Sequence, residues 1–332
     1  MRLLVTGAAG FIGSNYVCGL LSGALTAPPD IRVTVLDKLT YAGNLANLDP
    51  VTGDPRLTFV EGDIADDDLL ARLVPGHDAI VNFAAESHVD RSIAGSQDFV
   101  HANVVGTHAL LQAALDARVE RFVQVSTDEV YGSIAEGSWS EDSPVQPNSP
   151  YAATKAAADM LACAFARTHG LNVSITRCGN NYGPRQYPEK LIPLFITHLL
   201  EGRPVPLYGD GENVRHWIHV EDHCRAVQLV LHKGEPGAVY NVGGGRELTN
   251  TSIARQLIEA CGSPADSIRH VPDRPGHDYR YSLDGGKLRD LGFTPRIGFE
   301  EGLAATVRWY RENRSWWEPL KDIATKVAEN RP

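Results

Sequence analysis

The sequence predicts an α/β fold in which a doubly wound parallel sheet is joined to a smaller C-terminal lobe. Short apolar runs rich in Val and Ile alternate with longer helical stretches through the first 180 residues. Continuous apolar strands indicate a sheet buried on both faces, and the alternation of strands with helices favours parallel pairing. A glycine-rich segment between the first strand and the first helix is typical of one class of such sheets.

The expected elements follow in chain order. We predict strands at residues 3–6, 33–36, 57–60, 79–83, 122–125 and 173–176, and helices at residues 10–22, 67–73, 103–117 and 151–169. The last of these helices has a well-marked start, because Ser149 can cap it and Pro150 suits the first helical position. The acidic run at residues 66–68 indicates a helix N-terminus, where negative charge is favoured, in preference to a cation site.

The composition changes beyond about residue 180, where Pro, Gly and Tyr become frequent. At 332 residues the chain is too long for one small core, so two parts are expected. We assign residues 1–180 to a cofactor-binding domain and residues 181–332 mainly to a substrate-binding lobe. Segments near residues 215–245 are expected to return to the sheet.

Charge and cysteine content narrow the class of protein. The formal net charge is −10 and Lys and Arg do not cluster, which argues against a nucleic-acid partner. No apolar stretch approaches the ~18 residues of a membrane helix, so no membrane partner is expected. The chain enters a strand at once, which leaves no room for a signal peptide, and its five scattered cysteines resemble reduced core residues. A cytoplasmic location is the expectation.

The glycine-rich segment predicts a dinucleotide site. Gly7, Gly10 and Gly13 follow a strand and open a helix, so the backbone can approach a pyrophosphate at the helix N-terminus. Asp37 ends the next strand, where a carboxylate accepts from both ribose hydroxyls and repels a 2′-phosphate. NAD is therefore favoured over NADP, and residues 1–180 read as a Rossmann-type NAD-binding domain. Asp63 follows the third strand, at a position that suits either an adenine contact or a plain turn.

Tyr151 and Lys155 predict a proton-transfer site. Residues at i and i+4 of a helix share one face, so the phenol and the ammonium can meet the same small volume. A free Tyr has a pKa near ~10, so a phenolate near pH 7 needs about 4 kcal/mol of differential stabilisation. Lys155 and a nicotinamide cation together can supply it. Asp128 and Glu129 follow another predicted strand, at the end where catalytic groups gather in α/β sheets.

These motifs resemble the extended short-chain dehydrogenase/reductase family and, within it, the dTDP-glucose 4,6-dehydratases. The resemblance rests on STDEVYG at residues 126–132, YAATK at 151–155, NNYGP at 180–184 and RPGHD at 274–278. It implies a hydro-lyase that oxidises C4 of the sugar, eliminates water across C5 and C6, and returns the hydride to C6. The product would be dTDP-4-keto-6-deoxyglucose, with tightly bound NAD regenerated in each turnover.

The same resemblance implies a role for each catalytic residue. Thr127 replaces the Ser usual in the family's triad and orients the sugar's 4-hydroxyl, which Tyr151 deprotonates with Lys155 beside it. Glu129 is the base at C5, and Asp128 is the acid that protonates the departing C6 hydroxyl. Paired carboxylates suit this division of labour.

The resemblance also implies two sets of binding residues and an oligomeric state. The cofactor set comprises Gly7, Gly10, Phe11, Ile12, Gly13, Asp37, Lys38, Asp63, Ile64, Ala84, Ala85, Ser126, Tyr151 and Lys155. The nucleotide-sugar set comprises Ser87, His88, Thr127, Asn180, Lys190, Leu191, Pro206, Tyr208, Arg215, Asn250, Arg274 and His277. Relatives usually pair through helices equivalent to residues 103–117 and 151–169, so a homodimer is implied.

Two other functions stay open. A nucleotide-sugar 4-epimerase of the same fold would share Tyr151, Lys155 and Thr127, but it has no use for acids at C5 and C6. A non-catalytic NAD-sensing binding protein would use the fold without turnover and need not keep the Tyr and the Lys. The pair Asp128 and Glu129 therefore distinguishes the dehydratase from both alternatives.

Two features outside the motifs could suggest other sites. The histidines at residues 216, 219 and 223 are not expected to bind a metal, because no Cys or carboxylate cluster completes a coordination set. Trp309, Trp316 and Trp317 are expected to pack the terminal helix, with a subunit interface as the alternative.

Overall fold

The centre of the molecule is a seven-stranded parallel sheet. The computed structural model describes residues 1–329, and the strand order of this sheet is β10-β6-β5-β4-β1-β2-β3, with every neighbouring pair parallel. The strands are β1 (Arg2–Thr6), β2 (Arg32–Asp37), β3 (Leu57–Glu61), β4 (Ala79–Asn82), β5 (Arg121–Thr127), β6 (Val173–Cys178) and β10 (Val239–Val242). The strand order reverses between β1 and β4, which creates a crevice at the carboxyl ends of the strands.

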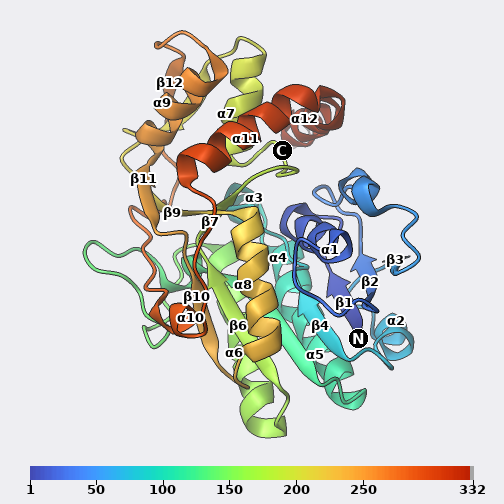
Figure 1. Ribbon diagram of the computed structural model, residues 1–332. Helices are drawn as coiled ribbons and strands as arrows, with labels where there is room; N and C mark the ends of the chain where they lie inside the picture. The colour runs from blue at the N-terminus through green and yellow to red at the C-terminus, as the bar shows by residue number, and fades with distance from the viewer. Residues whose placement is uncertain (330–332) are drawn as a thin grey trace.

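Helices cover both faces of this sheet (Figure 1). α1 (Phe11–Ser22) and α8 (Val220–Lys233) pack on one face, whereas α2 (Asp67–Leu73), α5 (Thr107–Asp116) and α6 (Pro150–His169) pack on the other. Successive residues of β1 alternate between the two cores: Leu3 and Val5 belong to the first and Leu4 to the second, all fully buried. Burial on both faces explains the continuous apolar strands, and the predicted doubly wound α/β fold of the Rossmann type is confirmed.

Two predicted helix starts are confirmed by their capping bonds. The Ser149 hydroxyl accepts a hydrogen bond from the backbone N–H of Ala152 at 3.1 Å, and Pro150 is the first residue of α6. At the start of α2 the Asp66 carboxylate accepts from the backbone N–H of Leu69 at 2.9 Å. Each side chain satisfies an N–H group that has no partner within its helix.

The predicted start of the helix at residue 103 is wrong. α4 (Gln97–Phe99), a π-helical segment η2 (Val100–Gly106) and α5 run into one another with helical backbone angles throughout. A π-turn contains more residues than an α-turn. The buried residues of a π-helical segment therefore do not recur every 3.6 residues, which is the spacing that indicates an α-helix in a sequence. The helical segment therefore begins earlier than its apolar periodicity indicates.

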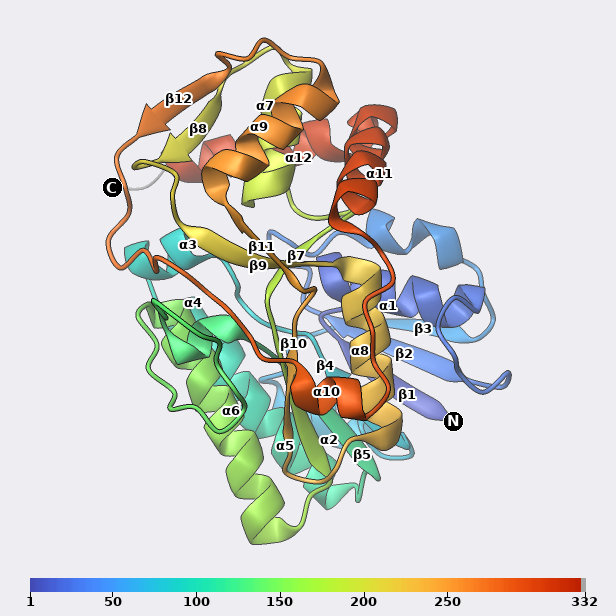
Figure 2. The same ribbon diagram turned by 60° about the vertical axis from the view of Figure 1, so that its left-hand side comes forward.

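The second lobe lies above the carboxyl ends of the large sheet. Figure 2 shows a three-stranded sheet between the large sheet and the upper helices; its strands are β7 (Asn180–Tyr182), β9 (Val214–His219) and β11 (Arg246–Thr249). Above it, β8 (Val205–Tyr208) pairs with β12 (Ile268–Val271), beside α7 (Leu191–Leu200), α9 (Asn250–Cys261), α11 (Phe299–Glu312) and α12 (Arg314–Glu329). Three short helices, α3 (Val89–Ala94), η1 (Leu45–Val51) and η3 (Asp128–Tyr131), lie in loops of the large sheet, and α10 (Gly286–Asp290) packs on β10.

The chain crosses between the two parts more than once. Of the segment near residues 215–245, α8 and β10 lie on the large sheet, whereas β9 belongs to the three-stranded sheet. The domain division at residue 180 stays a prediction, and residues 330–332 of the predicted lobe lie outside the described residues.

The tryptophans near the C-terminus pack the end of the chain onto the molecule. Trp317 is fully buried in the apolar core of the second lobe, and its indole N–H donates to the carbonyl oxygen of Tyr310 at 2.8 Å. The rings of Trp309 and Trp316 lie 5.0 Å apart in an edge-to-face arrangement. The indole N–H of Trp316 donates to Asn47 Oδ1 at 2.9 Å, which joins α12 to η1 of the large domain. The predicted packing role is confirmed.

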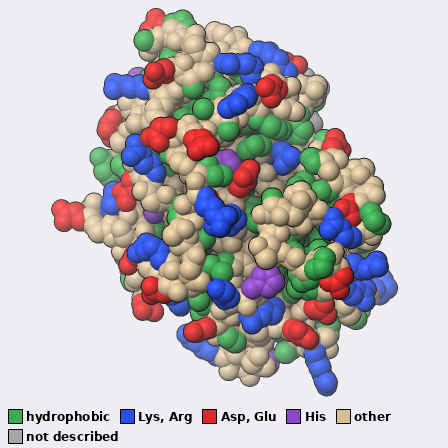
Figure 3. Space-filling model, in the orientation of Figure 1, with side chains coloured by type: hydrophobic (Ala, Val, Ile, Leu, Met, Phe, Trp, Pro, Cys, Tyr) green, Lys and Arg blue, Asp and Glu red, His purple; other side chains and the backbone are tan. Residues whose placement is uncertain are grey.

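The exposed surface carries mixed charge. Figure 3 shows acidic and basic side chains interspersed over the face that is turned toward the viewer in Figure 1. Among the helices within residues 1–329, none combines the length and the apolar character needed to cross a membrane.

Candidate active site

A cavity of about 330 Å³ lies where the strands of the large sheet end beneath the second lobe. Ligands of doubly wound sheets bind at this edge, beside the point where the strand order reverses. The lining contains every residue predicted to bind the cofactor: Gly7, Gly10, Phe11, Ile12, Gly13, Asp37, Lys38, Asp63, Ile64, Ala84, Ala85, Ser126, Tyr151 and Lys155. It also contains Thr127, Asp128 and Glu129. One cavity therefore brings together all the predicted cofactor and catalytic residues.

The glycine turn after β1 leaves no space for side chains. Gly7 has a left-handed backbone (φ 68°), and a Cβ on it would lie 2.5 Å from the backbone nitrogen of Ala84. A Cβ on Gly13 would lie 2.6 Å from the carbonyl oxygen of Gly7. A ligand can therefore come close to the backbone of the turn and to the N-terminus of α1. Such a site fits the pyrophosphate of a dinucleotide.

Asp37 joins this turn to the end of β2. Its carboxylate accepts hydrogen bonds from the backbone N–H groups of Ala9 at 2.8 Å and Leu39 at 2.9 Å. Burial raises the pKa of Asp37, and these two bonds oppose the rise. A carboxylate has about four acceptor sites, so two remain to receive ribose hydroxyls, as NAD requires.

Lys38 is already paired with a carboxylate. Its ammonium lies 2.7 Å from Asp63 Oδ2, and the ring of His101 approaches the same oxygen at 3.1 Å. Although burial opposes the change, hydrogen bonds from Lys38, Ala65 and His101 lower the pKa of Asp63. With its charge engaged by Asp63, Lys38 is a poor partner for the 2′-phosphate that distinguishes NADP from NAD.

The acidic pair stands at the end of β5. Thr127 is the last residue of this strand, and Asp128 and Glu129 open η3. The Thr127 hydroxyl accepts from the backbone N–H of Glu129 at 3.3 Å and lies 3.3 Å from Asp128 Oδ1. This short helix turns two successive carboxylates toward the cavity that Tyr151 also lines.

The surroundings of the two carboxyl groups differ. Burial, followed by the charge of Glu129, raises the pKa of Asp128 well above its usual range, and Arg215 only partly opposes this. Burial also raises the pKa of Glu129, but Lys190, Arg274 and Arg215 each favour its ionised form. Asp128 is thus the more easily protonated carboxyl and Glu129 the more easily ionised one.

Tyr151 and Lys155 lie on the first two turns of α6, with both side chains buried. Burial and the charge of Glu129 raise the pKa of Tyr151 well above its usual range, although a hydrogen bond with Thr127 acts to lower it. Burial lowers the pKa of Lys155, which Asp159 opposes, and the Lys155 ammonium donates to the carbonyl oxygen of Val125 at 2.7 Å. A base at Tyr151 therefore needs a positive charge from a bound group in addition to Lys155.

The predicted nucleotide-sugar residues fall into two groups. Ser87, Thr127, Asn180, Lys190 and Leu191 line the cavity. The cavity lining does not include His88, Pro206, Tyr208, Arg215, Asn250, Arg274 and His277. The nucleotide-sugar roles of both groups stay predictions.

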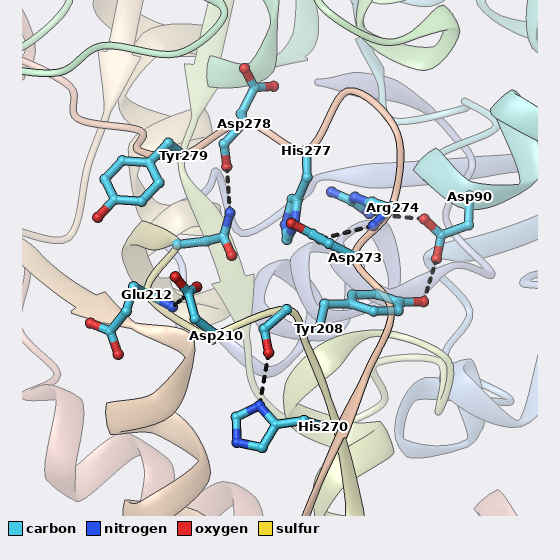
Figure 4. A network of polar contacts seen from close by, with 12 residues as sticks. Asp90, Tyr208, Asp210, Glu212, His270, Asp273, Arg274, His277, Asp278 and Tyr279 are labelled. Carbon is cyan, nitrogen blue, oxygen red and sulfur yellow. Dashed lines mark hydrogen bonds and ion pairs between the residues drawn. The ribbon is translucent and has the colours of Figure 1, made fainter.

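Several residues of the second group belong to a polar network beside the cavity (Figure 4). Asp90 accepts hydrogen bonds from Tyr208 at 3.2 Å and from Arg274 at 3.1 Å, one on each carboxylate oxygen. His277 is within 2.6 Å of Asp273 on the same loop. The network links α3, the end of β8 and the loop after β12, so it orders the segment that carries the RPGHD motif.

Arg215 takes a separate position on β9. Its guanidinium stacks 4.4 Å above the ring of Tyr281 and donates to the carbonyl oxygen of Asp278 at 2.9 Å. It acts on both catalytic carboxyl groups, because it favours the ionised forms of Asp128 and Glu129.

Sequence reasoning missed part of the lining. The missed residues include Thr40, Tyr41, Ala42, Gly43, Gln186, Tyr187, Glu189 and Trp217. The loop at residues 40–43 follows shortly after Asp37. Because loops at the carboxyl ends of the strands face the site, this position in the sequence could have predicted that the loop lines the cavity. Trp217 carried no such signal, because it reads as an ordinary apolar residue of a strand.

The three histidines on and after β9 have different partners. The ring of His216 accepts from the backbone N–H of Gly245 at 2.8 Å, and that of His223 contacts Asn181 Oδ1 at 3.0 Å. Within the described part of the chain, no group of three or more His, Cys, Asp or Glu side chains could hold a metal ion. That the protein needs no metal stays a prediction.

Comparison with known proteins identifies the relatives of this chain. The family model described as GDP-mannose 4,6 dehydratase matches residues 4–306. A dTDP-glucose 4,6-dehydratase from Streptomyces niveus is 61% identical over 97% of this chain and 96% of its own length. The solved structure of DesIV, a dTDP-glucose 4,6-dehydratase from Streptomyces venezuelae with NAD bound, has a TM-score of 0.95 and 63% identity over 96% of this chain and 100% of that chain. The UDP-glucose 4-epimerase of Thermotoga maritima has a TM-score of 0.87 and 32% identity over 95% of this chain and 100% of that chain.

The glycine turn makes a testable prediction about the cofactor. Gly7→Ala is expected to weaken NAD binding about tenfold or more, because the new Cβ would collide with the backbone at Ala84. The measurement is isothermal titration of the purified, cofactor-stripped protein with NAD. Gly23→Ala is the matched control: Gly23 has a similar φ of 81°, but a Cβ there meets nothing within 4 Å. Equal affinities for the two variants would contradict the role of the turn.

Proposed function

This chain belongs to the nucleotide-sugar 4,6-dehydratase family, and we propose that within it the chain dehydrates dTDP-glucose to dTDP-4-keto-6-deoxyglucose with NAD. The observation that carries the proposal is the pair Asp128 and Glu129 in the same cavity as Tyr151, Lys155 and the glycine turn. A simple oxidation of the sugar needs no such pair. An elimination of water needs one group to take a proton and another to give one.

The first step is proton removal from the sugar's 4-hydroxyl by Tyr151. Thr127, at the end of β5, is within hydrogen-bond reach of Tyr151 and can hold the same hydroxyl in place. When bound, NAD supplies the hydride acceptor for C4 and the hydride donor for C6. Lys155, fixed beneath the Tyr on the next helical turn, contributes a positive charge that favours the phenolate.

Elimination divides the work between the two carboxyl groups. The ketone at C4 makes the C5 proton acidic, and Glu129, whose ionised form Lys190 and Arg274 favour, removes it and returns a proton to C5 when the hydride has been delivered to C6. Asp128, whose pKa burial raises, is the carboxyl that more readily carries a proton, and it gives that proton to the departing C6 hydroxyl. Two titratable groups whose surroundings differ are what an acid and a base require.

The rival functions make less use of these residues. A 4-epimerase can have the same fold, as the structure from Thermotoga maritima illustrates, but it does not need Asp128 and Glu129. An NAD-sensing binding protein needs neither the acidic pair nor Tyr151. The acidic pair at the cavity therefore favours the dehydratase.

A homodimer is the proposed assembly. Val100 and Val105 of η2 and Met160 of α6 are exposed apolar side chains, with 45%, 48% and 59% of their surfaces accessible. They lie on two helical segments that pack against each other. Pairing of two copies through these helices would cover these side chains.

A cytoplasmic location is proposed on chemical grounds. All five cysteines are free thiols, three of them partly exposed. Free thiols persist in reducing compartments.

The function is tested by following substrate mass without added cofactor. We expect purified protein to convert dTDP-glucose to a species lighter by one water, and to leave UDP-glucose and GDP-mannose unchanged. An isomer of unchanged mass would indicate an epimerase. No reaction with any of the three would favour the binding protein.

The role of Glu129 is tested by Glu129→Gln. This variant should still oxidise C4, so the bound nicotinamide becomes reduced, but water elimination should slow by about 10²-fold or more. Nicotinamide absorbance reports the oxidation and product mass reports the elimination. Normal product formation by the variant would remove Glu129 from the mechanism.

The raised pKa of Asp128 predicts the pH dependence of elimination. The acid is active while protonated, so its contribution is present below the raised pKa and disappears as the pH rises through it. The contribution of this acid to the rate of water loss should therefore fall as the pH rises through the raised pKa, at a higher pH than for a free carboxyl group. Asp128→Asn should be slower, and its residual rate should lack that fall. The measurement is product mass against pH, and the same fall preserved in Asp128→Asn would contradict the assignment.

Dimer formation is tested by Met160→Glu. A buried charge at the centre of the proposed interface should convert a dimer into a monomer, which light scattering after gel filtration measures directly. Leu45→Glu is the matched control, because Leu45 is 48% exposed on η1, away from α6. A dimeric mass for both variants would contradict this interface.

A further inference from the structure

Four side chains that the mechanism does not use meet at the cavity. They are Tyr41 from the loop after β2, Arg91 from α3, and Tyr187 and Glu189 from the loop before α7. Tyr41, Tyr187 and Glu189 line the cavity, while Arg91 holds two of them from behind. We call these four residues the clasp. They join three segments that are far apart in the sequence.

The contacts within the clasp are specific. The Arg91 guanidinium lies 3.7 Å from the centre of the Tyr41 ring, a cation–π contact. The same guanidinium donates two hydrogen bonds to Glu189 Oε2, at 3.0 Å from Nε and 2.9 Å from Nη2. The ring of Tyr187 meets that of Tyr41 edge to face at 5.4 Å. One guanidinium therefore binds a residue of the cofactor domain and a residue of the second lobe at once.

The burial of the clasp makes these contacts effective. Only 15% of the Arg91 side chain and 14% of the Glu189 side chain are accessible to solvent, so the ion pair is poorly screened. Burial, followed by the charge of Glu189, raises the pKa of Tyr41, whose hydroxyl also hydrogen-bonds Glu189. The phenol is thus neutral, and its ring remains available to the guanidinium.

The loop that carries Tyr41 begins beside the cofactor residues. It follows Asp37 and Lys38 directly, and its Thr40 hydroxyl hydrogen-bonds Glu86 of the loop after β4. Gly43 allows this loop to fold back on itself, because a Cβ there would lie 2.9 Å from the Asp37 carboxylate. Movement of the loop away from Arg91 would therefore open the cavity next to the ribose-binding carboxylate.

We propose that the clasp of Tyr41, Arg91, Tyr187 and Glu189 closes the cavity over bound NAD and retains the cofactor between turnovers. The inference rests on the proposed function, in which the same cofactor must stay bound from oxidation to the return of the hydride. Loss of the reduced cofactor before that return would leave the sugar as a ketone. These four residues are positioning residues, because they act on the release of the cofactor and take no part in proton transfer.

The test measures release of reduced cofactor. Wild type, Arg91→Met, Glu189→Gln and the double variant are loaded with NADH, and its fluorescence is followed after a chase with excess NAD. Each single variant is expected to release NADH about tenfold faster, a change equivalent to about 1.4 kcal/mol. The double variant is expected to match Arg91→Met, because that substitution already breaks both the pair with Glu189 and the contact with Tyr41. Unchanged release, or additive effects in the double variant, would overturn the proposal.

The control variant is Arg280→Met. Arg280 forms a comparable two-bond pair with Glu247, at 2.9 and 3.1 Å, and neither residue lines the cavity. Its NADH release should equal that of wild type. Thermal unfolding of all variants identifies any that lose the fold. Tyr41→Ala repeats the test on the other partner of the guanidinium. This variant removes the aromatic ring but leaves the ion pair between Arg91 and Glu189 intact.

A second readout distinguishes retention from catalysis. The clasp variants should lose turnover of dTDP-glucose in the absence of added cofactor and regain a wild-type rate of C4 oxidation at saturating NAD. A rate of C4 oxidation that stays low at saturating NAD would overturn the retention role. If the wild-type protein binds no NADH, the proposed function is contradicted. If the wild-type protein binds NADH but the variants release it at the same rate, only the role of the clasp is contradicted.

Discussion

The structure depends on one constraint of parallel sheets: all strands end at the same edge. The glycine turn after β1, Asp37 after β2, the loop after β4 and the acidic pair after β5 are separated by tens of residues, yet they line one cavity. None of them needs a special packing arrangement to reach the others. The register of the sheet brings a phosphate-binding turn and a pair of carboxyl groups within one small volume.

Burial at this edge determines the chemistry of the titratable groups. Desolvation raises the pKa values of Asp128, Glu129 and Tyr151 together, so burial alone cannot assign an acid and a base. The second lobe makes the difference, because Lys190 and Arg274 come from that lobe and favour the ionised form of Glu129. The lobe therefore gives two adjacent carboxyl groups different electrostatic surroundings, which is what the proposed acid and base require.

The same lobe is joined to the large domain beside the cavity. Arg91 of the large domain contacts both Tyr41 and Glu189, two residues that line the cavity. Asp90, the residue before Arg91, binds Tyr208 and Arg274 of the second lobe. Two neighbouring residues of α3 thus hold the second lobe at two points, one at the cavity lining and one at residues of the predicted nucleotide-sugar set.

The sequence by itself determined the alternating strands, the glycine turn, the acid at position 37 and the spacing of Tyr151 and Lys155, because each depends on local periodicity or on a short motif. It did not reveal the π-helical start before residue 103 or the clasp. A π-turn departs from the period that patterns follow, and Tyr41, Arg91 and Glu189 are ordinary surface residues until the fold brings them together. Only the tertiary structure brings charges to Glu129 that favour its ionised form, since Lys190 and Arg274 lie about 60 to 150 residues away along the chain.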